Sequence, residues 1–440
     1  METDSLLQAA AHTSFAERNH LSNVDVFAKG LIGVVVFMLL LILCMKLVSF
    51  ISQKMDKKSG GAKCLLAGLL ILGCCSCGNR SRSLPDEAYL DFLQQIIASA
   101  YQENPDPTPF NEAFDIADFS ERITAIGDIP ASSQTSLRAF LEDYFKPGEE
   151  MLRQVMEGAD YQLVKFYWKN DTAHALFRIY DGNVRMEDWT LVTKRKQIFV
   201  QDILTVISGL RWSEEWNLNA CMYLSERNER LRLYERLIEV NQLVGASEFE
   251  KADSLFNWIA NATGEMRYAQ VLRLNLISQS QSFDSLVVCC ARFIKQFPDN
   301  QDIAHFYLLQ NAIRNGSMPQ VDSLCQQLEK DWGPDPIYFL YKAWGYKAAQ
   351  QLPESLRMLD SLVAYIPLVY DFYNYQLDLY DAMNDPEGFV RQLQKTDSLF
   401  FASEEDIPFY ETTYPNMTKS NAYQQWKQHH LKKLAEEQLP

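Results

Sequence analysis

The sequence predicts a mostly helical protein with an α+β part: an N-terminal transmembrane helix, then an α+β roll, then an α–α helical-repeat solenoid. Three observations predict this architecture. A charge-free apolar run occupies residues 30–45, strand-like segments alternate with turn signals over 161–207, and Asp-Ser-Leu recurs through the C-terminal half. The chain has 440 residues, which allows two or three domains and a sizeable core.

The first apolar segment, residues 30–51, carries one charge, Lys46, and is apolar on every face. It is long enough to span a bilayer core of about 30 Å. Lys46, Lys54, Lys57 and Lys58 lie at or beyond its C-terminal end, and this basic bias places that end in the cytoplasm. Residues 1–54 are therefore expected to form a transmembrane module.

The second apolar segment, Cys64–Gly73, is too short to span a membrane stably. Read from Met55, a basic stretch, this apolar run and the following Cys74 resemble a bacterial lipoprotein signal peptide over residues 55–77. The resemblance implies cleavage before Cys74 and a lipid on its thiol. A second membrane helix is the alternative. Residues 78–84 would then be a polar tether, with the body facing the periplasm from the inner membrane (helix 30–51) or the outer membrane (lipid).

Within the first 58 residues, Gly30, Gly33, Val36-Phe37 and the Leu39–Leu43 run follow a short polar N-terminus. This pattern resembles the gamma subunit of sodium-pumping oxaloacetate decarboxylases. The resemblance implies an accessory role in sodium ion transport, with the decarboxylase subunits as partners. A generic membrane anchor is the alternative. Because Met55 can also start a chain, residues 1–54 and 55–440 can also be read as two proteins in one frame.

Residues 85–212 are expected to form the roll, with helices first and an antiparallel sheet after them. The helical period covers 85–157. Strand-like runs then follow at Tyr161–Trp168, His174–Tyr180, Val184–Thr193 and Ile198–Ile207. Asn170-Asp171 and Asp181-Gly182 are hairpin signals. The pattern resembles cone-shaped rolls of the nuclear-transport-factor-2 or cystatin type, with helices on one sheet face. Such rolls often hold a pocket, so a glycan-binding or hydrolytic roll domain is an alternative function.

Residues 213–402 are expected to form the helical-repeat solenoid. The recurring tripeptide begins at Asp253, Asp284, Asp322, Asp360 and Asp397, which are 31 to 38 residues apart, a helix-pair period. Around the fourth copy, the small, aromatic and large positions Ala343, Tyr346, Ser355, Leu359 and Pro367 resemble a tetratricopeptide repeat. Residues 403–440 are expected to be a C-terminal extension with a capping helix.

The same tripeptides have a second interpretation. Asp followed by Ser or Thr and a small or aliphatic residue resembles the O-glycan acceptor of Bacteroides-type bacteria. The acceptor hydroxyls would belong to Thr172, Ser254, Ser285, Ser323, Ser361 and Ser398. The alternative, which we favour, is a repeated helix position in which polar side chains face water beside a buried leucine.

The sequence carries no P-loop, dinucleotide fingerprint, GxSxG elbow or HExxH. We therefore expect no catalytic residues, no metal site and no cofactor. The net charge of −16 argues against a nucleic-acid partner. The body cysteines are expected to be buried thiols, with a disulfide from Cys325 to Cys289 or Cys290 as the alternative.

These features favour a non-enzymatic, membrane-tethered scaffold that binds a protein partner in the cell envelope. Aromatic side chains on the concave face of the solenoid are the candidates for gripping the partner. They are Tyr338, Tyr341, Trp344, Tyr370 and Tyr373.

Overall fold

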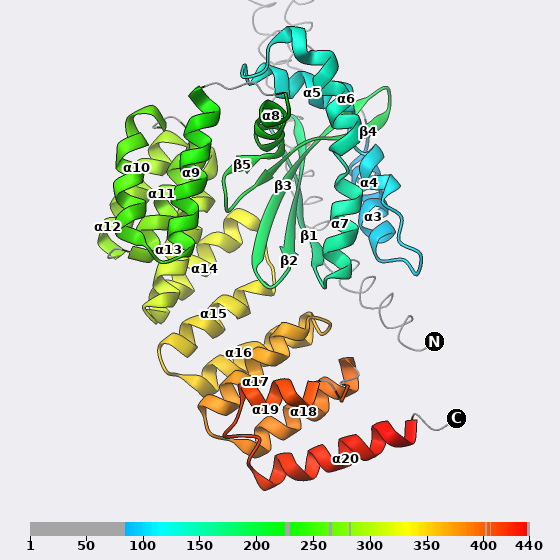
Figure 1. The fold of residues 1–440 in the computed structure, drawn as a ribbon, viewed down its shortest axis with the longest axis vertical. Coiled ribbons are helices and arrows are strands. Elements are labelled where there is room, and N and C mark those ends of the chain that lie inside the picture. Colours follow the sequence, from blue (N-terminus) through cyan, green and yellow to red (C-terminus); the bar gives the residue numbers. More distant parts are fainter. Residues whose placement is uncertain are drawn as a thin grey trace, which may run out of the picture. The chain divides into compact units, whose positions relative to one another are not determined.

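A computed structural model describes residues 84–224, 229–263, 266–280, 283–400, 403–404 and 406–437. The expected transmembrane helix, the signal segment with Cys74 and nearly all of the tether lie outside the described residues. Ser83–Pro440 forms one compact unit, and Figure 1 shows its described residues.

Helices come first in the unit, as the sequence predicts. They are α3 (Asp86–Ala100), α4 (Thr108–Glu112), α5 (Ile116–Ala125), the 3₁₀ turn η1 (Ala131–Ser133), α6 (Gln134–Tyr144) and α7 (Pro147–Met156). Asp115 caps α5 by accepting from the backbone N–H groups of Ala117 and Asp118. Gly148 allows the start of α7 to approach Pro107, because a Cβ there would lie 2.0 Å from the Pro107 carbonyl oxygen.

Five antiparallel strands follow and pair in sequence order. They are β1 (Asp160–Lys169), β2 (Thr172–Tyr180), β3 (Val184–Lys194), β4 (Gln197–Thr205) and β5 (Leu210–Arg211). The predicted turns are present: Asn170 and Asp171 both have positive φ, at 50° and 60°, and Gly182 has a φ of 90°. Positive φ at two central residues gives the backbone twist that tight hairpins need. The α+β part with an antiparallel sheet is therefore confirmed.

The strand β2 is buried on both of its faces. Phe177 and Ile179 pack with the helices α3–α8, whereas Leu176 and Tyr180 pack with the C-terminal helices. A strand covered on both faces reads as a nearly continuous apolar run rather than as an alternation. The expectation of helices on one sheet face is therefore incomplete, because C-terminal helices cover the other face.

The helix α8 (Trp212–Tyr223) belongs with the roll. Its Ala220 and Cys221 join the same buried cluster as Trp189 of β3, and Asn217 donates to the backbone carbonyl of Ile123 in α5 at 3.2 Å. The helices of the C-terminal half therefore begin after α8 rather than at residue 213.

Ten helices then follow one another along the described part of the chain. They are α9 (Glu229–Gly245), α10 (Phe249–Thr263), α11 (Arg267–Ser280), α12 (Phe283–Gln296), α13 (Gln301–Arg314), α14 (Met318–Trp332), α15 (Ile337–Ala348), α16 (Leu352–Tyr365), α17 (Tyr370–Ala382) and α18 (Pro386–Phe400), with the 3₁₀ turn η2 (Pro298–Asn300) before α13. The five Asp-Ser-Leu tripeptides lie on α10, α12, α14, α16 and α18, every second helix, as their spacing predicts.

Three of these helices, α11, α13 and α17, contact the sheet or the turn after β4. The Tyr307 hydroxyl on α13 donates to the Ile207 carbonyl at 3.0 Å, and the Arg267 Nε on α11 donates to the Gly209 carbonyl at 2.6 Å. On α17, the Phe372 ring lies 4.7 Å from that of Tyr180 in β2. One buried cluster joins the sheet to these helices, so the roll and the helical pairs share a core.

The C-terminal extension covers the last helical pair. It contains α19 (Asp406–Thr413) and α20 (Asn421–Glu437). Tyr410, Tyr423 and Trp426 pack with Phe389 and Leu393 of α18 in a separate buried cluster. This placement agrees with the expected capping helix.

Candidate functional site

Three of the five aromatic residues expected to grip a partner are buried. Tyr338, Tyr341 and Tyr373 retain 8%, 2% and 1% of their accessible surface. They belong to the cluster that joins the sheet to the C-terminal helices. The expected concave face is therefore covered here by the chain's own sheet, and these three rings belong to the core rather than to an exposed surface.

The other two expected residues, Tyr370 and Trp344, are half-buried. The Tyr370 hydroxyl lies 3.2 Å from the Tyr410 hydroxyl, so Tyr370 ties α17 to the C-terminal extension. The Trp344 ring lies 5.9 Å from the Tyr341 ring and 6.1 Å from the Tyr375 ring. Trp344 also faces a cavity between the sheet and the helices.

This junction cavity has a volume of about 400 Å³. Its lining combines the β2–β3 hairpin, the end of β4, α13 and α15. The residues are Asn183, Val184, Ile207, Phe306, Leu309, Gln310, Ile313, Tyr341 and Trp344. Apolar walls with a few polar groups, at this volume, are typical of ligand sites.

The residues that line the junction cavity bring two side-chain amides and one hydroxyl, that of Tyr341, which is buried without a hydrogen-bond partner in the described part of the chain. Asn183 and Gln310 are both exposed. Among the described residues, neither side chain has a hydrogen-bond partner in the protein. Each amide can both donate and accept, so the two can pair with a ligand's N–H and C=O groups.

A buried ion pair lies in the same interface. Arg178 on β2 is 1% exposed and donates to Asp160 at 2.8 Å and to Asp335 at 3.1 Å. Asp335 precedes α15 and also accepts from the backbone N–H of Ile337 at 2.8 Å. Burial raises the pKa of the Asp160 carboxyl, and the Arg178 guanidinium opposes that rise. This network fixes α15, and with it Tyr341 and Trp344, against the sheet.

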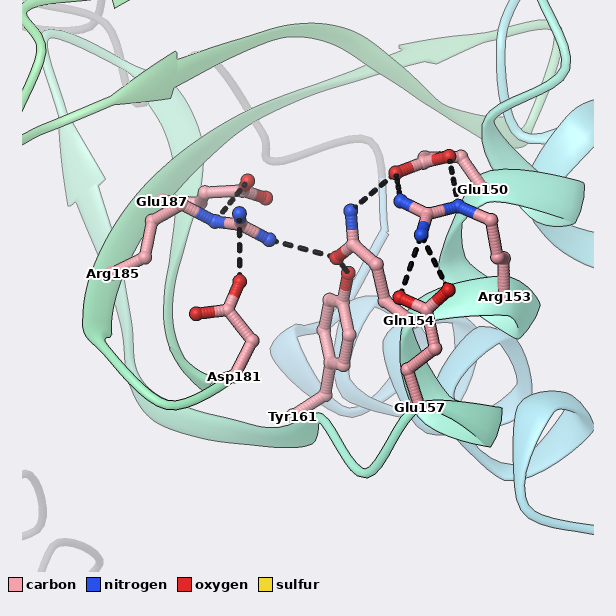
Figure 2. Close-up of polar contacts among 8 residues, drawn as sticks. All are labelled: Glu150, Arg153, Gln154, Glu157, Tyr161, Asp181, Arg185 and Glu187. Carbon is pink, nitrogen blue, oxygen red and sulfur yellow. Dashed lines mark hydrogen bonds and ion pairs between the residues drawn. The ribbon is translucent and has the colours of Figure 1, made fainter.

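A second polar network lies inside the roll and is centred on Arg185 (Figure 2). Arg185 contacts Asp181 at 3.1 Å, the Gln154 side-chain oxygen at 2.8 Å and Glu187 at 3.5 Å. Glu187 is 5% exposed and accepts from the Trp189 indole at 3.1 Å. Burial raises the pKa of Glu187, and the Arg185 charge opposes the rise.

From Gln154 the network continues to the surface along α7. Gln154 accepts from the Tyr161 hydroxyl at 2.6 Å and donates to Glu150 at 2.7 Å. Arg153 then joins Glu150 to Glu157, with both contacts at 2.6 Å (Figure 2). Polar side chains are clustered in the roll, as a glycan-binding or hydrolytic domain would need. They pair with one another, however, so the arrangement locks α7 to the β2–β3 hairpin.

The candidate O-glycan acceptors lie on the surface or close to it. Ser254, Ser323 and Ser398 are exposed. Thr172, Ser285 and Ser361 are half-buried, and Thr172 begins β2 after a hairpin turn. The leucine of every Asp-Ser-Leu tripeptide packs in or against a buried cluster. Packing of this kind is what a repeated helix position requires.

The histidines and cysteines, which could act in catalysis or bind a metal, are engaged in structural contacts or buried. His174 contacts Asp188 at 3.0 Å and His305 contacts Asp331 at 2.9 Å. The described cysteines are free, and burial raises the pKa of Cys290 and of Cys325 to about 12, which keeps both thiols protonated. In the described part of the chain, no three His, Cys, Asp or Glu side chains are grouped to hold a metal ion.

Sequence reasoning found Tyr341 and Trp344 but missed the remaining cavity residues and the Arg178 network. The membrane-related expectations concern residues before 84, and within the described residues no helix has the length and apolarity needed to span a membrane. No protein-family model, curated protein or solved structure matches this chain.

Proposed function

We propose that this chain is a membrane-tethered, extracytoplasmic scaffold without enzymatic activity, and that the junction cavity is the place where it holds a protein partner. The observation that carries the proposal is the cavity itself, where Trp344 meets apolar side chains from the sheet and from α13. Interfaces obtain most of their affinity from a few anchors that fill such pockets.

The rigidity of the cavity walls supports this function. Val184 belongs to the sheet and Phe306 to α13, and both lie in the shared buried cluster. The Arg178 network also holds the segment that leads into α15. A preformed pocket loses little conformational entropy when it is filled, which favours binding.

A change at Trp344 tests the proposal. Trp344→Ala should reduce recovery of the partner from crosslinked cells by about tenfold or more, because it removes the aromatic wall of the anchor pocket. Gln310→Arg changes an exposed residue at the same cavity. It should also reduce recovery of the partner, and it should leave the buried core unaltered. Recovery is measured by quantitative mass spectrometry of the purified full chain.

The matched control is Trp258→Ala on α10, where the ring is 73% exposed and lies away from the cavity. This variant should recover the partner as the unchanged chain does. Equal recovery from Trp344→Ala, Gln310→Arg and Trp258→Ala would contradict the proposed site.

The tether is tested by the intact mass of the mature protein. We expect a chain that begins at a lipidated Cys74. We expect no added sugar mass, because packing of the leucines explains why the Asp-Ser-Leu tripeptide recurs. A chain that begins at Met1 would instead make helix 30–51 the anchor. Added hexose-sized increments would support the glycan interpretation of Ser254, Ser323 and Ser398.

A further inference from the structure

The helix α17 lies next to the junction cavity, on the side of Trp344. Tyr375 on α17 meets the cavity residue Trp344, with ring centroids 6.1 Å apart. One turn earlier on the same helix, Asp371 accepts from the Tyr180 hydroxyl at 3.3 Å. Residues four apart lie on one face of a helix, so Asp371, which contacts Tyr180 of the sheet, and Tyr375, which contacts Trp344, lie on the same face of α17.

The Asp371 carboxylate also lies beside the tip of the β2–β3 hairpin. A Cβ on Gly182 would be 3.9 Å from its Oδ2 atom. The next residue along the hairpin is Asn183, whose side chain lines the cavity. The contacts with Tyr180 and Gly182 therefore place this carboxylate close to Asn183 and Val184, which line the cavity.

No basic side chain of the described residues forms an ion pair with Asp371, and two basic residues of the hairpin and of α15 pair with other carboxylates. Arg185 contacts Asp181 and Glu187. Lys347 of α15 contacts Asp378 at 3.4 Å. A half-buried carboxylate without a counter-ion attracts a positive charge on a ligand, and the net charge of −16 adds to that attraction.

Apolar walls, two amides without protein partners and one carboxylate without a counter-ion, all among the described residues, therefore lie close to one another. The amides of Asn183 and Gln310 can pair with the N–H and C=O groups of a main chain. The apolar walls can accept one bulky side chain. The Asp371 carboxylate can pair with a basic side chain beside it.

We infer that the occupant of the junction cavity is an extended segment of a partner protein in which a bulky apolar residue stands next to a lysine or arginine. The apolar side chain fills the cavity and the basic side chain pairs with Asp371. This inference rests on the proposed function and adds the chemistry of the segment that is recognised.

Short peptides test the inference with the full chain in lipid nanodiscs, because detergent could itself fill an apolar cavity. The probes are fluorescein-labelled peptides of sequence Gly-Ser-Trp-Lys-Ser-Gly, Gly-Ser-Trp-Glu-Ser-Gly and Gly-Ser-Ala-Lys-Ser-Gly. Fluorescence anisotropy should show the Trp-Lys peptide binding about tenfold more tightly than either of the others, and this preference should shrink as salt is raised.

The carboxylate is tested by Asp371→Asn, which keeps an acceptor for the Tyr180 hydroxyl but removes the charge. We expect the preference for Trp-Lys over Trp-Glu to fall to about twofold. The matched control is Asp284→Asn, the same change at an exposed position of α12, which should keep the full preference. Equal binding of Trp-Lys and Trp-Glu, or binding of no peptide, would overturn the inference.

The two proposals fail in different ways. If Trp344→Ala loses the cellular partner while Asp371→Asn keeps both the partner and the peptide preference, the scaffold stands and the basic segment is wrong. If Trp344→Ala keeps the cellular partner, the proposed anchor itself is wrong. Tight binding of an uncharged lipid probe with no peptide preference would identify a lipid as the occupant. Self-association abolished by Gln310→Arg would identify a second copy of the chain. Either result would overturn the peptide inference.

Discussion

Replacing Arg178 with methionine should lower the free energy of unfolding of the Ser83–Pro440 unit by about 3–5 kcal/mol. The change removes the cation that Asp160 and Asp335 share, at 2.8 and 3.1 Å. The Asp335 side chain is 1% exposed and would keep a buried charge without a counter-ion. Urea unfolding followed by far-UV circular dichroism measures the loss.

The loss should depend on pH in a defined direction. Burial already raises the folded-state pKa of the Asp160 carboxyl, and without Arg178 it rises further above the unfolded value of about 3.9. A carboxyl whose folded pKa is raised destabilises the fold as pH rises through that interval, because the folded state must then release a proton that it holds more tightly. The difference from the unchanged chain should therefore be larger at pH 7 than at pH 4.

Adding Asp335→Asn to Arg178→Met should recover part of the lost stability. The amide carries no charge and can still accept from the backbone N–H of Ile337, as Asp335 does at 2.8 Å. A deficit that is unchanged by the second substitution, or equal at pH 4 and pH 7, would show that lost packing rather than unpaired charge explains the effect.

Replacing Trp189 with alanine should cost about 3–5 kcal/mol of unfolding free energy. Trp189 is fully buried. Its ring stacks on Phe110 with centroids 4.7 Å apart and lies 4.4 Å from the ring of Phe177. Alanine would leave a cavity at the centre of the roll and remove the indole donor from the buried Glu187.

Two further variants separate these effects. Trp189→Phe keeps an aromatic ring but removes the donor, so it should cost about 1–3 kcal/mol, the usual penalty for an unsatisfied buried polar group together with the smaller ring. Trp258→Ala removes an indole that is 73% exposed and should change stability by less than about 0.5 kcal/mol. Comparable losses from Trp189→Ala and Trp258→Ala would refute the assignment of Trp189 to the core.

The strands of the roll could be placed from sequence because their signals are local. Asn170-Asp171 and Asp181-Gly182 mark two hairpins, and the structure has β2 between them. The helix pairs could be placed for a related reason, since the Asp-Ser-Leu tripeptide marks one position on every second helix.

Local sequence signals could not predict which elements cover the second face of the sheet, although the sequence of β2 indicates that a second cover exists. Its segment His174–Tyr180 is apolar at consecutive positions rather than at alternate ones, as in Leu176-Phe177 and Ile179-Tyr180. Such a run indicates burial on both faces but does not say which element supplies the second cover. Local signals therefore predict an open concave face for Tyr341, which the cluster shared with the sheet buries, whereas Tyr373 is buried against Phe400 of α18.

The candidate site was harder still, because its parts are far apart in sequence. Asn183 comes from a hairpin, Gln310 from α13 and Trp344 from α15. None of the three carries a motif, and only tertiary packing brings them together. A single exposed amide has no signature in a sequence, so Asn183 and Gln310 could not be distinguished from other surface residues.

The burial of β2 on two sides has a consequence for how the chain matures. Synthesis runs from the N-terminus at about 5–20 residues per second, so roughly 10–40 s separate the emergence of Tyr180 from that of Phe372, its partner on α17. During that interval Tyr180 lacks the ring that later covers it, so part of the apolar sheet face that contains Leu176, Tyr180 and Met186 stays exposed. A nascent chain of this kind is prone to aggregate, which makes it a natural client for chaperones that bind exposed apolar strands until the last helices arrive.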